Sequence, residues 1–240
     1  VIPDVIITPI NELVEGINQL EAAKKLKQEW ILARVTKDDV TNNLVEVDVS
    51  KLTPHPLQKE IYGDEDIHES KVFKAIKETR RVEPLTITPD HDNPGFYRIV
   101  IGHTRWRSCL ELDIRRVSAY VEFFICDLDE EEVFLSSNIQ REKTNEQKAK
   151  MSAHWWQIIE KRNAERKSLN NQQHTRDGKN FTTREQVGEL VGWSGYTTQH
   201  AIKVVEKLKE LPEARADEVR KVLAKSVDAA YKELYPPKVE

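Results

Sequence analysis

The spacing of apolar residues along the chain predicts a small α/β region followed by a helical one. Alternating apolar and polar positions at Val45–Val49 predict a strand, and β-rich runs predict three more, at 84–88, 97–101 and 117–121. Apolar residues at helical spacing predict one helix over 70–80 and another after Gly102. This β-α-β-β-α-β order favours an α/β domain in which helices pack on a small sheet that is mostly parallel or mixed.

The segment before this region, residues 1–44, is expected to be an N-terminal arm. Leu13, Ile17 and Leu20 recur at helical spacing, so a helix is expected from Asn11 to about Ala33. The sequence does not indicate whether this arm packs on the next domain or on another subunit.

The second half of the chain is predicted to be helical. Thr144–Gln147 has the pattern of a capping box, so a helix is expected from there to about Lys167. Its wide apolar stripe, which includes Trp155 and Trp156, is typical of a core helix. The predicted divisions of the chain are the arm at 1–44, an α/β domain at 45–127, a helical domain at 128–212 and a C-terminal helix at 213–240.

Residues 182–208 fit two short helices joined by a tight turn. Thr182 or Thr183 can cap the first helix, Gly192 can end it, and Ser194 can cap the second. A helix-turn-helix has this plan and places its second helix in the major groove of DNA, although a plain helical hairpin would give the same pattern. Gln199 suits adenine edges, and its neighbours suit phosphates. The residues expected to contact DNA are Thr183, Arg184, Ser194, Tyr196, Thr197, Gln199, His200 and Lys203.

The stretch Ile99–Leu112 carries the clearest chemistry. A β-rich run stops at Gly102, and a short basic segment then leads into an apolar run at helical spacing. Glycine lets the backbone come close to a ligand, and the first N–H groups of a helix favour an anion. Arg105 and Arg107 add fork-shaped donors that suit phosphate. The stretch therefore points to a polyphosphate or a phosphate backbone, and the alternative is a tight turn with two solvated arginines.

Charge and cysteine content add to this picture. The net charge of −4 is uneven: residues 1–138 hold 17 Lys and Arg against 26 Asp and Glu, whereas residues 139–210 hold 14 against 9. A positive middle on an acidic chain is what a DNA-contacting region would show. Cys109 and Cys126 are too few for a disulfide framework or a zinc cluster, and both are expected to be small core residues. No apolar run approaches the roughly 20 residues of a membrane span.

Three segments in order along the chain resemble the sequence boxes of the ParB family. Gly102–Ser108 resembles the family's G-E-R-R-W-R-A box, Leu52–Gln58 its first box, and Asn138–Glu142 its E-N-x-Q-R-E box. With the helix pair that follows, the resemblance covers about residues 45–212. It implies a domain whose fold is shared with sulfiredoxins, followed by a DNA-binding helix-turn-helix.

The resemblance also implies a function in plasmid or chromosome partition. A family member binds a specific site on double-stranded DNA, and CTP with magnesium closes its dimer into a sliding clamp. The implied partners are DNA, a second copy of the chain and a ParA-type ATPase, with no membrane, and the implied location is the cytoplasm at the nucleoid or a plasmid. On this template the residues expected to bind nucleotide are Thr53, Gln58, Gly102, His103, Thr104, Arg105, Arg107, Asn138 and Arg141.

The chain departs from the family pattern at three positions. His103 and Thr104 stand where the family has glutamate and arginine, and Ser137 replaces the glutamate that helps to hold the metal. Because magnesium prefers carboxylate oxygens, nucleotide binding is expected but hydrolysis is doubtful, and no catalytic or metal-ligating residue is assigned. The alternatives are a ParB-like nuclease, which would need clustered carboxylates, a relative that phosphorylates a small molecule, and a helix-turn-helix regulator without nucleotide switching.

Overall fold

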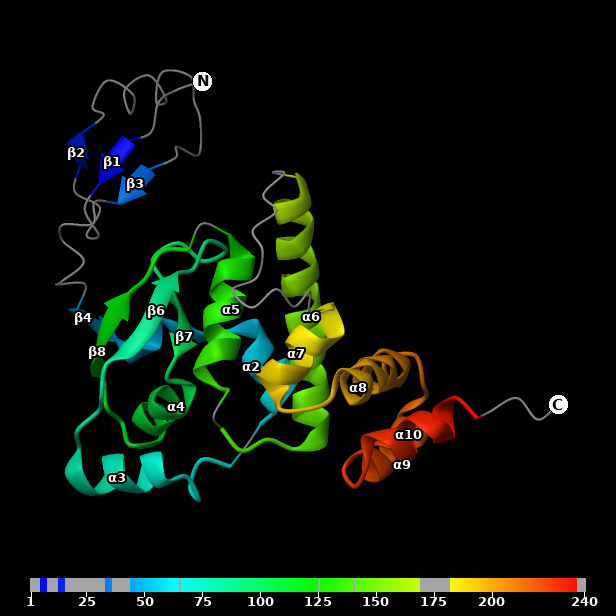
Figure 1. Cartoon of the computed structure of the whole chain (residues 1–240). Coiled ribbons are helices and arrows are strands. Elements are labelled where there is room, and N and C mark those ends of the chain that lie inside the picture. The colour runs from blue at the N-terminus through cyan, green and yellow to red at the C-terminus, as the bar shows by residue number, and fades with distance from the viewer. Residues whose placement is uncertain are drawn as a thin grey trace. The chain divides into compact units, whose positions relative to one another are not determined.

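The computed structural model of the chain describes residues 5–7, 13–15, 33–35, 44–64, 66–124, 126–139, 141–168 and 182–236 (Figure 1). Its contacts divide the chain into two compact units. The first unit contains residues 1–55 and 66–124, and the second contains residues 56–65 and 125–240. Residues 56–65 therefore belong to the second unit, although in sequence they lie between the two segments of the first.

A five-stranded mixed sheet with the order β4-β8-β6-β7-β5 forms the centre of the first unit. The β4–β8 and β6–β7 pairs are antiparallel, and the β6–β8 and β5–β7 pairs are parallel. The strands are β4 (Leu44–Asp48), β5 (Leu52–Pro54), β6 (Leu85–Pro89), β7 (Tyr97–Ile101) and β8 (Arg116–Val121). The predicted α/β class is confirmed, with a mixed sheet rather than a mostly parallel one, and β5 is a strand that the sequence pattern did not predict.

Two helices and a short 3-10 turn accompany this sheet. The turn η2 (Val49–Lys51) joins β4 to β5, and α3 (Lys71–Thr79) packs on α4 (His103–Glu111). Ser70 caps α3, since its hydroxyl accepts a hydrogen bond of 3.2 Å from the N–H of Val72. The core between α4 and the sheet contains Leu85, Ile87, Ile99, Cys109 and Ala119, all fully buried.

A separate three-stranded sheet lies near the N-terminus. Its order is β2-β1-β3, made of β1 (Val5–Ile7), β2 (Leu13–Glu15) and β3 (Ala33–Val35). The helix predicted over Asn11–Ala33 is therefore wrong at both of its ends, because β2 pairs antiparallel and β3 pairs parallel with β1. Strand pairing with a β-branched segment here outweighs the helical spacing of the apolar residues. Residues 16–32 lie outside the described part of the chain.

The described part of the second unit is helical, as predicted. Its helices are α2 (Pro56–Tyr62), α5 (Asp127–Ser137), α6 (Asn145–Ser168), α7 (Thr183–Val191), α8 (Gly195–Leu208), α9 (Glu213–Leu223) and α10 (Val227–Leu234). The predicted capping box is present: Thr144 Oγ1 accepts from the N–H of Gln147 at 3.2 Å, and Gln147 Oε1 accepts from the N–H of Thr144 at 3.0 Å. Trp155 is buried, as expected of a core helix.

The C-terminal segment forms two helices rather than the one predicted. Ser226 separates α9 from α10 and caps α10, because its hydroxyl accepts from the N–H of Ala229 at 3.3 Å. Both helices share one core with α6 and α8, which buries Ala149, Ala201, Val204, Val219 and Leu223 completely. The tail therefore packs on α6 and on α8, the second helix of the pair.

The two cysteines have different environments. Cys109 is fully buried, and burial raises the pKa of its thiol to about 11. Cys126 is exposed at the start of α5, so the prediction that it is a core residue is wrong. Among the described residues, no helix is both long enough and apolar enough to cross a lipid bilayer.

Candidate functional site

The junction between β7 and α4 depends on a glycine. Gly102 has φ of +110° and forms the N-cap of α4. A Cβ at this position would lie 2.6 Å from Cδ2 of Leu85, which is fully buried. The glycine therefore lets the backbone lie close to the core of the sheet, and the close approach to a ligand stays a prediction.

The two arginines of the junction have different surroundings. The guanidinium of Arg105 donates hydrogen bonds to the carbonyl of Glu83, at 3.2 Å, and to the carbonyl of Pro84. Arg105 therefore holds the segment that leads into β6. Arg107 is half-buried, and no described residue accepts a hydrogen bond from its guanidinium. Of the two, Arg107 has its donors available for a ligand.

His103 joins the glycine box to the first box. It is buried at 6 % exposure, and its Nε2 accepts a hydrogen bond of 3.0 Å from the backbone N–H of His55. Accepting at Nε2 requires the neutral tautomer that carries its proton on Nδ1. This contact makes His103 a hydrogen-bonding residue of the turn.

A buried aspartate fixes Thr53, one of the two predicted nucleotide-binding residues of the first box. The hydroxyl of Thr53 lies 3.0 Å from Oδ2 of Asp90 and 3.2 Å from the carbonyl of Tyr97. Burial raises the pKa of Asp90, but hydrogen bonds from Asn93, Thr53 and Arg98 outweigh it and lower the pKa overall. Sequence reasoning missed Asp90, because its partner Thr53 lies 37 residues earlier in the chain.

The remaining predicted nucleotide-binding residues belong to the second unit. Gln58 lies on α2, and Asn138 ends α5, where its Nδ2 donates to the carbonyl of Phe134 at 2.9 Å. The Ser137 hydroxyl donates to the same carbonyl at 2.8 Å. Arg141 lies with its guanidinium carbon 4.6 Å from the centre of the Tyr62 ring. A pocket that these residues share with Gly102 stays a prediction.

Two helices joined by a tight turn are present at the predicted positions. The carboxylate of Glu185 accepts from the N–H and from the hydroxyl of Thr182, each at 2.8 Å, and these bonds lower the pKa of Glu185. Gly192 ends α7 with φ of +73°, and Ser194 Oγ accepts from the N–H of Thr197 at 3.1 Å. At Gly188 a Cβ would lie 2.6 Å from the carbonyl of Trp193, so this glycine, which sequence reasoning missed, sets how closely the turn packs.

The structure leaves most of the predicted DNA-contacting residues accessible. Tyr196 is 63 % exposed, and Arg184, Ser194 and Lys203 are also exposed. Thr183, Thr197 and Gln199 are half-buried.

His200 is the exception, and the prediction that it faces DNA is wrong. It is buried at 8 % exposure, and its Nδ1 lies 2.9 Å from Oδ1 of Asp228. Its ring also stacks on Tyr231 at 3.7 Å with a 4° angle between the planes. His200 therefore faces α10, because helical spacing alone does not show that the C-terminal helix covers this side of α8.

The donor set of the first unit fits a phosphate better than the described residues fit a metal. The first N–H groups of α4, the Thr104 hydroxyl and the Arg107 guanidinium are donors that phosphate oxygens accept from. The described residues bring together no group of three or more His, Cys, Asp or Glu side chains that could hold a metal ion. At the end of α5, Ser137 and Asn138 offer only neutral oxygens.

Comparison with known proteins decides the family of this domain. The model of the ParB N-terminal domain matches residues 33–139. The chain carries a ParB N-terminal domain. The mixed sheet, the glycine box on α4 and the end of α5 all lie within the matched residues, so the resemblance inferred from the three boxes is confirmed.

Individual relatives are distant. The nucleoid occlusion protein of Bacillus pumilus (strain SAFR-032) is 27% identical over 107 residues, which are 44% of this chain and 35% of that protein. The match thus spans about a third of that relative. C-terminally truncated ParB from Caulobacter crescentus, complexed to the centromeric parS site, is 17% identical over 81% of this chain and 86% of that one, with a TM-score of 0.44. A Pnob8-like ParB-N domain is 14% identical over 80% and 95%, with a TM-score of 0.42.

Proposed function

We propose that this chain is a ParB-like protein of plasmid or chromosome partition. It binds a specific site on double-stranded DNA through α7 and α8, and it binds CTP at the start of α4 to switch a dimeric clamp. The observation that carries the proposal is the glycine-opened start of α4 with Arg107, set within a ParB N-terminal domain. The partners of such a protein are DNA, a second copy of the chain and a ParA-type ATPase at the nucleoid or plasmid.

The chemistry of the nucleotide side follows from the donors at α4. A triphosphate placed at the helix start receives the unpaired N–H groups of the first turn, and the helix dipole favours its charge. Arg107 supplies paired donors, and Thr104 supplies a hydroxyl. Thr53, Gln58, Asn138 and Arg141 are proposed to complete the site.

Binding is proposed without efficient hydrolysis. Magnesium, when bound with the nucleotide, would neutralise phosphate charge. Ser137 gives it a neutral hydroxyl where the family pattern has a carboxylate, and that hydroxyl already donates to the carbonyl of Phe134. Any CTPase activity is therefore expected to be weak.

The DNA side uses the accessible face of the helix pair. Gln199 can pair with an adenine edge in the major groove, and Tyr196, Thr197 and Lys203 can contact phosphates. Thr183, Arg184 and Ser194 lie at the two helix starts, where DNA phosphates are favoured.

The experiment that tests the nucleotide side is a titration of the full chain with CTP, ATP, GTP and UTP in the presence of magnesium. We expect selective binding of CTP that Arg107→Gln weakens by about tenfold or more, since a charged hydrogen bond to phosphate is lost. Lys221→Gln, at an exposed position of α9, is the matched control and should bind CTP as the original chain does. If the original chain and both variants bound CTP equally, or if none of them bound it, the α4 start would not be the nucleotide site.

A second arm tests the DNA side by selecting bound fragments from a random duplex library and measuring affinity for the enriched site. Gln199→Ala should weaken binding to that DNA site by about 1–3 kcal/mol and leave CTP binding unchanged. Site-specific binding without any nucleotide response would instead favour a helix-turn-helix regulator.

A further inference from the structure

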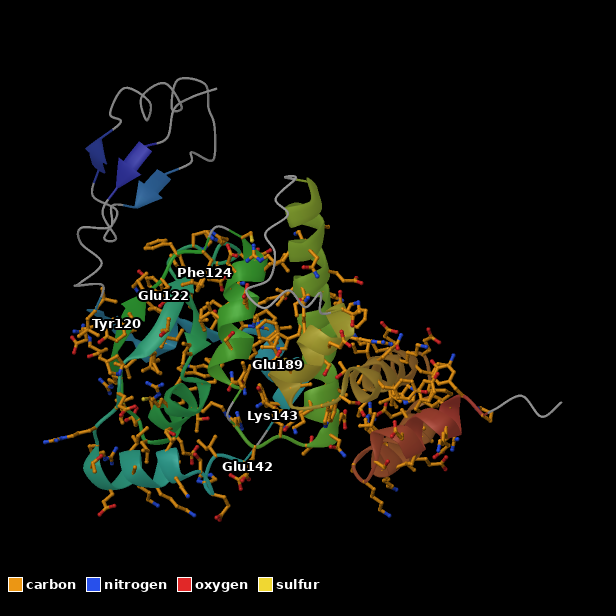
Figure 2. All side chains as sticks on the ribbon, viewed as in Figure 1. Tyr120, Glu122, Phe124, Glu142, Lys143 and Glu189 are labelled. Carbon is orange, nitrogen blue, oxygen red and sulfur yellow. The ribbon has the colours of Figure 1, made fainter. Side chains whose placement is uncertain are left out.

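A cleft of about 590 Å³ is lined by residues of the helical unit, and Arg141 is the one residue of this lining that the proposed CTP site also includes. Its walls are residues 139 and 141–143 of the connection between α5 and α6, the first turns of α6 and the last turn of α7, which leads to Gly192. In Figure 2, Lys143 and Glu142 are labelled on that connection, and Glu189 is labelled on α7. A volume of this size is within the range of small-molecule sites.

Three cations line the cleft. Lys143 is half-buried, and its ammonium donates to the carbonyls of Ile139, at 2.8 Å, and Arg141, at 2.7 Å. The described residues thus use two of its three N–H donors and fix the direction of the third. Lys148 lies over the Trp193 ring at 5.6 Å, and Arg141 is the third cation of the lining.

The charges of the two lysines are not balanced by nearby carboxylates. Neither lysine forms an ion pair with any described residue, although Glu142 and Glu189 also line the cleft. Burial and then repulsion from Lys148 and Arg141 lower the pKa of Lys143. A bound anion would relieve that repulsion.

The rest of the lining indicates what the anion carries. Met151 is buried and lines the cleft, and Leu190, Val191 and the 38 % exposed Ile139 add apolar surface. The two carboxylates can accept hydrogen bonds from hydroxyl or amino groups. Cations, an apolar wall and acceptors in one cleft suit a ligand with a phosphate at one end and a sugar and base at the other.

We propose that this cleft binds a small phosphate ester of nucleoside monophosphate size, with its phosphate on Lys143 and Lys148 and its polar hydrogens on Glu142 and Glu189. Lysine ammonium groups act as point charges toward phosphate, which suits two side chains converging from separate segments. The bound ester contacts the last turn of α7, directly before the turn into α8. Its binding is therefore expected to stabilise that end of the helix pair.

The test is calorimetric titration of the full chain with inorganic pyrophosphate and with AMP, CMP, GMP and UMP. We expect binding of at least one monophosphate, weakened about tenfold by Lys148→Gln. Glu189→Gln should weaken binding of the monophosphate but not binding of pyrophosphate, because only the ester presents hydroxyl and amino donors. Hydrogen exchange at residues 189–192 should slow with the ligand in the original chain and not in Lys148→Gln.

Two further variants separate binding in this cleft from binding at α4 and from a general effect of net charge. Lys221→Gln changes the net charge by the same amount as Lys148→Gln, but at a position outside the cleft. Arg107→Gln removes the proposed nucleotide donor at α4. Both should bind the monophosphate as the original chain does. Absence of binding, an equal loss in Lys221→Gln, or a loss in Arg107→Gln that matches Lys148→Gln would overturn the proposal. Equal affinity for pyrophosphate and all four monophosphates would overturn the role given to the apolar wall.

Discussion

Replacing Gly102 with alanine should destabilise the first unit more than an ordinary glycine substitution does. The backbone at Gly102 has φ of +110°, and holding a side chain in such a region costs about 1–3 kcal/mol. The added Cβ would also lie 2.6 Å from Cδ2 of Leu85, which has no exposed surface into which it could move. Overpacking of this kind costs about 1–3 kcal/mol. The sum is a loss of about 2–6 kcal/mol.

Gly95→Ala is the matched control. Gly95 belongs to the same unit, has φ of +89°, and has nothing within 4 Å of the position of an added Cβ. It therefore carries the backbone strain without the contact, and its expected cost is about 1–3 kcal/mol. The difference between the two variants isolates the contact with Leu85.

Native-state hydrogen exchange at the amides of β6 and β7 measures the free energy of unfolding of the first unit. These strands carry the core of the first unit, so their slowest amides report its opening. We expect the loss in Gly102→Ala to exceed that in Gly95→Ala by about 1–3 kcal/mol. Equal losses would refute the claim that the glycine is required by its contact with the core, and no loss in either would refute the strain argument as well.

Three further predictions concern titration and reactivity. Near neutral pH one thiol per chain should react rapidly with a disulfide reagent and Cys126→Ser should abolish that reaction, because burial raises the pKa of Cys109 to about 11. A hydrogen bond from Arg162 lowers the pKa of Asp129, although burial opposes this shift. The stability that this pair contributes is therefore present above the usual aspartate pKa and is lost as pH falls through the lowered pKa. The urea midpoint of Arg162→Met should therefore change less with pH in that window than the midpoint of the original chain, and an unchanged slope would count against this pairing. The pKa of Glu185 is lowered by its bonds to Thr182, so the helix content of α7 should fall as pH drops below the usual glutamate value, and Glu185→Gln should remove that pH dependence in circular dichroism.

The elements that sequence predicted well are those with a strong local signal. Tyr97–Ile101 alternates and then meets a glycine, and β7 has these bounds. Thr144 and Gln147 satisfy each other within a single turn, so the start of α6 was predictable as well. In both cases, the information that fixes the element lies within a few residues.

The elements that sequence missed depend on partners far along the chain. β5 is a strand because Leu52–Pro54 pairs with β7, more than forty residues later. The short strand at Ala33–Val35 likewise depends on its pairing with β1, 28 residues earlier in the chain. Helical or turn-like local patterns in these segments give way to a ladder of backbone hydrogen bonds that only the folded chain supplies.

In the candidate site, too, the sequence predicted a local motif but not the distant partners of its single side chains. The sequence predicts that the glycine box binds phosphate, which stays a prediction, but it does not show which residues of the box support the fold. His103 receives the N–H of His55, and Arg105 holds the carbonyls that precede β6, so both side chains maintain the shape of the domain. Changing either one would therefore confound a loss of ligand with a loss of structure. Arg107, whose donors no described residue uses, is the position at which a change of charge tests phosphate binding alone, because its removal leaves those supporting hydrogen bonds in place.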